Sequence, residues 1–142
     1  MPVRAFIRTD LALAQLETAL QLYFGGTDYA SVITLAGAAD EIFGQRLTAS
    51  GRESSLYSLK KAVGEIHQVL YGEATAPKQI ADRANFARNS LKHWKMGDSD
   101  IVKFDIQQEA NDMLNRAIDN YWQLEAKLSV AMEEFQRANM AA

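Results

Sequence analysis

The sequence predicts an all-α protein with an antiparallel four-helix bundle core and flanking helices. Apolar residues recur every three or four positions along most of the chain, which is the spacing of an amphipathic helix. No segment alternates apolar and polar residues for long enough to build a sheet. The only prolines are Pro2 and Pro77, so the predicted helices have no breaker in their interiors. Short loops between such helices favour antiparallel neighbours.

The helix boundaries follow from caps, glycines and the apolar spacing. Besides the second helix, treated next, helices are predicted over residues 10–24, 55–70, 77–97, 106–124 and 129–138, the last two of which could also be continuous. The candidate N-caps are Thr9 or Asp10, Ser54 or Ser55, and Asp105. The third helix carries an apolar stripe that we expect to point inward, formed by Leu56, Leu59, Val63, Ile66 and Leu70.

The second helix, predicted over residues 28–49 with Thr27 or Asp28 as its cap, has unusually small residues in its middle. Gly37 costs about 1 kcal/mol of helix propensity relative to alanine. A helix accepts this cost most readily where a neighbouring backbone approaches closely. We therefore expect it to be the most tightly packed helix, with core positions at Val32, Leu35, Ala39, Ile42 and Leu47.

Composition limits the classes of protein and of site. The length of 142 residues predicts a single domain with its core at about residues 10–124. The absence of cysteine excludes disulfides and thiolate metal sites. The N-terminus lacks the apolar region of a signal peptide and no run approaches membrane-spanning length, so a cytoplasmic location without membrane insertion is expected.

The net charge of −3 argues against a general nucleic-acid coat protein, which usually has a basic surface. Between residues 78 and 95, however, positive residues outnumber the single Asp82: Lys78, Arg83, Arg88, Lys92 and Lys95. This stripe is either a phosphate-attracting surface or an ordinary solvated helix face.

The segment Arg88-Asn89-Ser90-Leu91-Lys92-His93 carries the clearest chemical signal. A guanidinium grips a phosphate with a planar fork of donors, and an imidazole gains or loses a proton near neutral pH. Metal-free phosphodiester cleavage needs both groups. We therefore take Arg88, Asn89 and His93 as candidate catalytic residues, with Lys92 and Lys95 as candidates for substrate binding.

The spacing of these residues constrains how such a site could form. In a helix, Arg88 and His93 point about 140° apart, whereas Asn89 and His93 share a face. A working site needs Arg88 to curl around the helix or a second protomer to supply the missing group, as a two-fold homodimer can. The alternatives are a structural ion pair from Arg88 to Asp40 or Glu41, and an imidazole at His93 that interacts with the last helical carbonyls.

Other site chemistry has little support in the sequence. No Glu-x-x-His pair and no histidine pair at ligand spacing is present, so neither a metal nor a cofactor is expected. His67 is expected to be a partly buried core or surface residue. The larger aromatic residues are either stacking platforms for bases or anchors of the core or of a dimer interface: Trp94, Tyr121, Trp122 and Phe135.

Arg88-Asn89 followed by His93 resembles the Arg-polar-x-x-x-His signature of the HEPN superfamily (higher eukaryotes and prokaryotes nucleotide-binding). Two flanking segments, YASVITLAGAADEIFG over residues 29–44 and EANDMLNRAIDNYWQL over residues 109–124, resemble helices of stand-alone HEPN-like proteins. The resemblance spans residues 27–124.

The resemblance implies an all-α bundle that dimerises with its signature helices facing each other. It implies a metal-independent endoribonuclease, often a toxin with an antitoxin partner, or a relative that binds nucleotides or partners without catalysis. Arg88 would stabilise charge on the phosphorane, His93 would act as general base or acid, and Asn89 would orient the imidazole or the phosphate. Members modified by a nucleotidyltransferase antitoxin often carry tyrosine where this chain has Lys95, which departs from that pattern.

Overall fold

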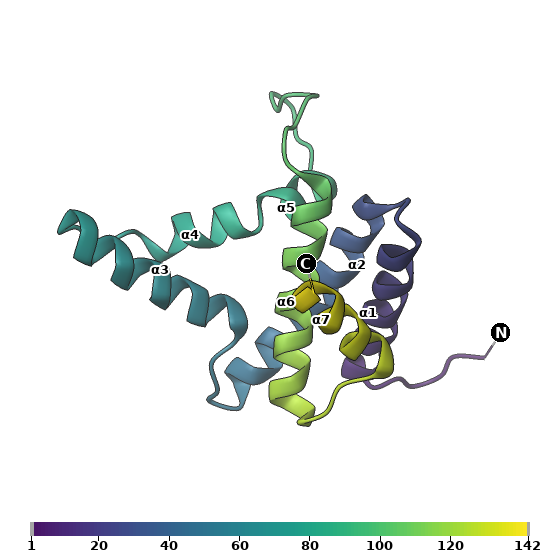
Figure 1. The fold of residues 1–142 in the computed structure, drawn as a ribbon. Helices are drawn as coiled ribbons and strands as arrows, with labels where there is room; N and C mark the ends of the chain where they lie inside the picture. Colours follow the sequence, from purple (N-terminus) through teal and green to yellow (C-terminus); the bar gives the residue numbers. More distant parts are fainter. Residues whose placement is uncertain (1, 142) are drawn as a thin grey trace.

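The computed structural model describes residues 2–141, which form helices and loops with no strand among them, so the predicted all-α class is confirmed (Figure 1). The helices are α1 (Arg8–Gly25), α2 (Tyr29–Ala49), α3 (Ser55–Tyr71), α4 (Pro77–Ala84), α5 (Phe86–Lys92), α6 (Ile106–Glu125) and α7 (Val130–Ala141).

The core forms where α2 packs against both α1 and α6. α2 contributes Val32, Ile33, Phe43 and Leu47, all fully buried, and α7 closes one side of α1. The ring of Phe135 on α7 lies 5.3 Å from that of Tyr23 on α1, edge to face. The short α5 also contacts α2, so α5 lies at the edge of the core.

Three predicted N-caps are confirmed. Asp28 accepts from the backbone N–H of Ser31 at 3.0 Å, and Asp105 accepts from that of Gln108 at 3.0 Å. Ser54 caps α3 by accepting from the Tyr57 backbone N–H at 3.1 Å. These caps depend only on local sequence, because each oxygen satisfies a donor that the first helical turn leaves free.

The first helix starts earlier than the caps predicted. Ile7 occupies the N-cap position of α1 without a side-chain hydrogen bond, and Asp10 lies inside the first turn. An acidic residue there still favours the helix, since it interacts with the positive end of the helix dipole.

Gly37 lies under a close contact, as expected, but the neighbour is a side chain rather than a backbone. A Cβ atom at Gly37 would lie 2.5 Å from Cδ and 2.9 Å from Cγ of Arg88 on α5. The small residue therefore makes room for the aliphatic part of an arginine. This contact sets how closely α5 approaches α2.

α3 and α4 extend away from the core as an arm, defined here as residues 55–84 (Figure 1). The inward stripe predicted for α3 is wrong, because no residue of α3 is buried. α3 contacts α4 and, less extensively, α6. Apolar residues spaced three and four positions apart indicate that a helix has an apolar face. They do not indicate whether another part of the same chain covers that face.

None of the helices within residues 2–141 combines the length and the apolar character needed to cross a bilayer.

Replacing Gly37 with alanine is expected to lower the free energy of unfolding, although alanine is the better helix former. The added methyl group displaces Arg88 from its place against α2, and we expect a loss of about 1–2 kcal/mol by chemical denaturation. Gly64→Ala in α3 is the matched control, since nothing lies within 4 Å of its Cβ position. That variant should be neutral or slightly stabilised. Equal stability of the two variants would contradict the close-contact interpretation.

Candidate functional site

The segment that carries Arg88 and His93 is not one long helix. The helix predicted over residues 77–97 is wrong in two respects: it is interrupted at Asn85, and it ends at Lys92. His93 follows α5 with an extended backbone (φ −130°, ψ 135°), and its N–H donates to the Asn89 carbonyl at 2.9 Å. The His93 imidazole therefore projects from the residue that immediately follows the end of α5.

A buried arginine from α6 accounts for the interruption. Nη1 of Arg116 donates to Oδ1 of Asn85 at 2.9 Å and to the Ala84 carbonyl oxygen at 3.2 Å. The Ala84 carbonyl oxygen thus accepts from a guanidinium at the residue where the backbone hydrogen bonding of α4 ends. The tertiary contact divides what the sequence pattern predicted as a continuous helix.

Arg116 belongs to a polar network inside an otherwise apolar core. Its Nη2 donates to Oδ2 of Asp40 on α2 at 2.7 Å. The Asn120 amide donates to Oδ1 of Asp40 at 3.0 Å and accepts from the Ser55 backbone N–H at 2.7 Å. Asp40 and Asn120 are only 4% and 1% exposed. Asp40, Arg116 and Asn120 thus each have partners, which limits the cost of removing them from water, although Nε of Arg116 is buried without one.

Burial raises the pKa of the Asp40 carboxyl group above its ordinary value, because the charged form loses hydration. The guanidinium of Arg116 opposes this rise, and that of Arg88 does so to a smaller extent. The electrostatic state of Asp40 therefore depends on both arginines. Asp40 links the network to the candidate site.

The sequence patterns do not single out Arg116 as a functional or structural residue. The signal is the spacing: Arg116 follows Met113 by three positions and precedes Asn120 by four, so all three lie on one face of α6, where they are buried. A charged residue at such a position requires a buried partner. Asp40 was proposed only as a partner for Arg88.

Arg88 lies against α2. Its side chain is 15% exposed, and Nη1 is 3.8 Å from Oε2 of Glu41, which makes a loose ion pair. Its Nε is buried without a hydrogen-bond partner among residues 2–141. Of the two partners considered for Arg88, Glu41 is the one in contact. The guanidinium keeps donors that this contact does not use.

Arg88 opens onto a polar hollow of about 320 Å³ at the base of the arm, which we call the Arg88 hollow. Its other lining residues include Glu41, Tyr57, Lys60 and Asn120. The wall therefore holds charges of both signs. Its acidic members and its three amides, Gln45, Asn85 and Asn120, give it a mixed hydrogen-bonding character.

His93 lies on the other side of α5. It lines a larger hollow of about 680 Å³, which we call the His93 hollow, between α5 and the loop of residues 94–104. Asn89 and Ser90 share this hollow, and the exposed rings of Phe86 and Trp94 stand at its rim. Asn89 and His93 thus share one site, as their spacing of four residues predicts.

The structure does not bring Arg88 and His93 together within one protomer, because each lines a different hollow. The candidate substrate-binding residues Lys92 and Lys95 are both exposed. The Lys95 backbone N–H donates to Oδ2 of Asp98 at 3.0 Å, which shapes the turn after His93. Positive charge therefore lies close to His93 along the chain.

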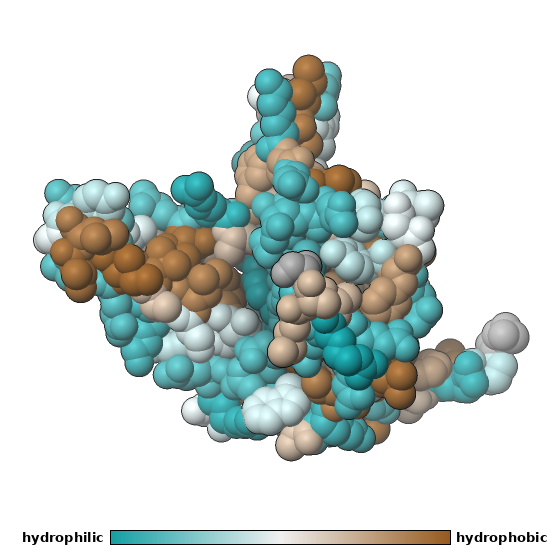
Figure 2. Space-filling model, in the orientation of Figure 1, coloured by the Kyte–Doolittle hydropathy of each residue, from teal (hydrophilic) through white to brown (hydrophobic). Residues whose placement is uncertain are grey.

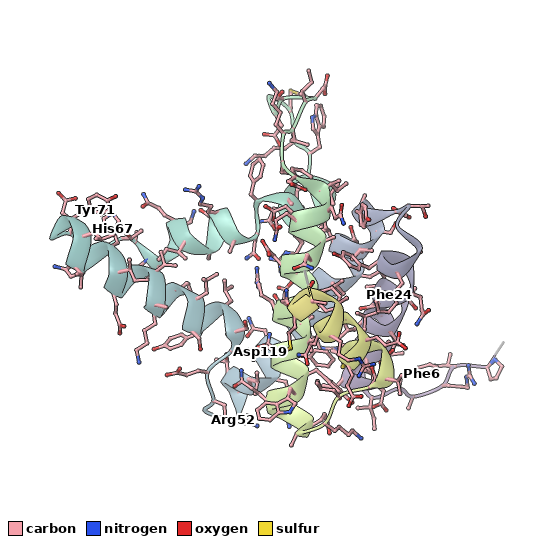
Figure 3. The ribbon with its side chains drawn as sticks, viewed as in Figure 1. Phe6, Phe24, Arg52, His67, Tyr71 and Asp119 are labelled. Carbon is pink, nitrogen blue, oxygen red and sulfur yellow. The ribbon has the colours of Figure 1, made fainter. Side chains whose placement is uncertain are left out.

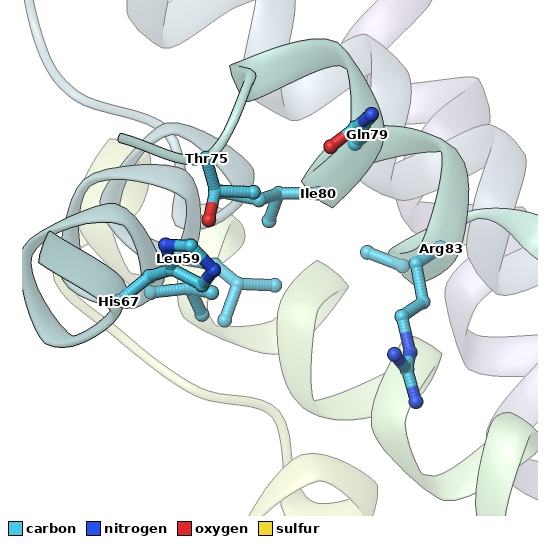
Figure 4. Close-up of a pocket in the computed structure, with 8 residues that line it drawn as sticks. Leu59, His67, Thr75, Gln79, Ile80 and Arg83 are labelled. Carbon is cyan, nitrogen blue, oxygen red and sulfur yellow. The ribbon is translucent and has the colours of Figure 1, made fainter. Parts of the chain in front are cut away.

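His67 lies on the arm, far along it from the core (Figure 3). Its Nδ1 donates to the Glu73 carbonyl oxygen at 2.7 Å, and its ring packs against Tyr71. It lines a third hollow, between α3 and α4, with Thr75, Gln79 and Arg83 (Figure 4). This hollow is separate from both candidate residues, so His67 serves as an internal comparison for His93.

Residues 2–141 contain no cluster of three or more histidine, aspartate or glutamate side chains arranged to hold a metal ion. Comparisons with protein-family models, with curated proteins and with solved structures found no match to this chain.

Replacing Arg116 with methionine should lower the free energy of unfolding by about 3–5 kcal/mol, since it leaves the Asp40 carboxylate buried without its partner. Chemical denaturation measures this loss. Lys78→Met breaks an ion pair whose side chains are 87% and 61% exposed, and it should change stability little. The double variant Asp40→Asn/Arg116→Met should recover part of the loss. Similar effects of the two single substitutions would show that the buried pair has no special role.

Proposed function

We propose that this chain is a HEPN-like, metal-independent endoribonuclease that acts as a two-fold homodimer. The observation that carries the proposal is the position of His93, which lines an open hollow together with Asn89 and next to exposed aromatic rings. The proposal includes assignment of the helical core to the HEPN-like four-helix bundles. It rests on the resemblance of Arg88-Asn89 and His93 to the signature of that superfamily.

The chemistry requires proton transfer and charge stabilisation but no metal. One imidazole takes the proton of a ribose 2′-hydroxyl as the 2′-oxygen attacks the adjacent phosphorus. The bond from phosphorus to the 5′-oxygen breaks, and a second imidazole returns a proton to that oxygen. The products are a 2′,3′-cyclic phosphate and a 5′-hydroxyl. A guanidinium next to the phosphorane stabilises its charge.

A dimer is needed because Arg88 and His93 line different hollows of one protomer. In a two-fold interface, a residue away from the axis meets a different residue of the other copy, and the same contact is repeated in reverse. Arg88 of one copy can thereby serve His93 of the other. The ion pair with Glu41 is loose, with 3.8 Å between Nη1 and Oε2, and leaves terminal N–H donors of Arg88 for a phosphate.

The surroundings of His93 suit a short stretch of RNA. The hollow of about 680 Å³ lies within the range of sites that hold small ligands. Trp94 and Phe86 are 64% and 47% exposed, and bases stack on such rings without sequence preference. Lys103 lines the hollow, as do Asp82 and Asp98, and the exposed Lys92 and Lys95 lie beside His93 in the chain, where they add positive charge for the phosphates.

A second candidate is a non-catalytic dimer that binds a nucleotide or a protein partner such as an antitoxin. The contact between Arg88 and Glu41 favours this candidate, because it holds the guanidinium on the side of α5 away from His93. In this case Arg88 has a structural role in holding α5 against α2, and the His93 hollow binds a ligand without catalysing a reaction.

The test is RNA cleavage by the purified chain in the presence of EDTA. Wild type should generate cyclic-phosphate ends, and His93→Ala should lower the rate by about a hundredfold or more. His67→Ala is the matched control, since it removes the only other histidine at a separate hollow and should retain activity. Unchanged circular dichroism of His93→Ala would exclude unfolding as the cause.

Loss of cleavage in both histidine variants, or in neither, would contradict the assigned role of His93. Absence of cleavage by wild type, together with a thermal shift on adding a mononucleotide that His93→Ala abolishes, would support the non-catalytic candidate. Asn89→Ala should weaken activity less than His93→Ala, because the amide orients groups and transfers no proton.

A further inference from the structure

The hollow between α3 and α4, which we call the arm hollow, differs in its lining from the Arg88 hollow and the His93 hollow. Its volume is about 490 Å³, and Leu59, Val63 and Ile80 form the apolar part of its wall (Figure 4). Figure 2 shows apolar surface running along the arm with polar residues on both sides of it. A hollow of this size, with an apolar wall and a few polar groups, is typical of a site for a small molecule.

The arm hollow has no acidic residue in its lining. Its polar lining residues are His67, Thr75, Gln79 and Arg83. The Arg88 hollow and the His93 hollow each contain two acidic residues. The chain as a whole has a net charge of −3, so a hollow without a carboxylate is not explained by composition. The guanidinium of Arg83 is the only fixed charge in the arm hollow.

Arg83 is available to bind an anion. It takes part in no ion pair within residues 2–141. Its neighbour in the chain, Asp82, pairs instead with Lys78 at 3.0 Å. The planar fork of a guanidinium matches the two oxygens of a carboxylate. One guanidinium balances one negative charge, which favours a carboxylate over a doubly charged phosphate group.

His67 and Arg83 lie toward opposite ends of the arm hollow (Figure 4). Nδ1 of His67 donates to the Glu73 carbonyl oxygen at 2.7 Å, so Nε2 is the nitrogen without a proton in the neutral ring. The ring carries no negative charge in either protonation state. A ligand whose anionic group contacts Arg83 can therefore extend along the apolar wall toward His67 without meeting a like charge.

We propose that the arm hollow binds a small monocarboxylate with an apolar chain, of the fatty-acid type. The carboxylate contacts the guanidinium of Arg83, and the chain packs on Leu59, Val63 and Ile80. The inference goes beyond the proposed activity, because none of these residues belongs to the candidate ribonuclease site.

A bound ligand should also hold the two helices of the arm together. α3 buries none of its 17 residues, and the arm hollow lies between α3 and α4. An apolar chain in the hollow removes apolar surface of both helices from water. A ligand that binds only the closed arm lowers the fraction of molecules in which the arm is open. Binding should therefore be detectable in the backbone of the arm.

The first test is isothermal titration calorimetry of the purified chain with decanoate, below the concentration at which decanoate forms micelles. Wild type should bind one decanoate per chain. Arg83→Gln should raise the dissociation constant about tenfold, because it removes charge-assisted hydrogen bonds. Arg46→Gln on α2 is the matched control, since Arg46 lies outside the arm hollow, and it should bind as wild type does. Both arginines are exposed, so neither substitution should disturb folding.

Two further ligands separate the contribution of the chain from that of the charge. Octanoate should bind about tenfold more weakly than decanoate, because it buries two fewer methylene groups. Decanol, which has the same chain without the charge, should also bind about tenfold more weakly. Equal binding of decanoate and decanol, equal binding by Arg83→Gln and Arg46→Gln, or no saturable binding by wild type would each overturn the proposal.

The second test locates the ligand by hydrogen exchange. Decanoate should slow backbone exchange in residues 55–84 and leave α1 unchanged. Val63→Glu should abolish this protection, because it places a negative charge in the apolar wall, and Val63 is 37% exposed, so the variant should fold. Slower exchange throughout the chain, or protection that survives Val63→Glu, would show binding outside the arm hollow and would overturn the proposal.

Neither measurement depends on RNA cleavage, and neither Arg83 nor Val63 lines the Arg88 hollow or the His93 hollow. Decanoate binding by a chain that leaves RNA intact would refute the ribonuclease alone. RNA cleavage by a chain that binds no decanoate would refute the ligand site alone.

Discussion

The buried ion pair between Arg116 and Asp40 is the interaction on which the rest of the structure depends. It joins α6 to α2, and its neighbours reach both ends of the arm: Asn85 after α4 accepts from Arg116, and Ser55 at the start of α3 donates to Asn120. The same few polar groups therefore determine where the arm leaves the core and where α5 begins.

A buried polar network of this kind adds little net stability, because its charged groups lose their hydration. Removing Asp40 and Arg116 from water costs free energy that their contact only partly returns, and the raised pKa of Asp40 reflects that cost. The same groups are satisfied in only one arrangement of α2, α6 and the start of α5. The network therefore selects this arrangement over others that bury equal apolar area.

The position of α5 explains why the candidate site is divided. Contact between Gly37 and Arg88 holds α5 against α2, so Arg88 faces the base of the arm while His93 faces the loop after α5. Chemistry that needs both groups thus needs a second protomer.

The sequence by itself determined the helical class and the features that depend on neighbours along the chain. Asp28, Ser54 and Asp105 act as caps because each bonds an N–H within its own first turn, and Asn89 and His93 share a hollow because they lie four residues apart. Only the tertiary structure decided the interruption at Asn85, the pairing of Arg88 with Glu41 and the exposure of α3. These depend on groups distant in sequence, such as Arg116, and periodicity within one segment carries no information about which distant surface covers it.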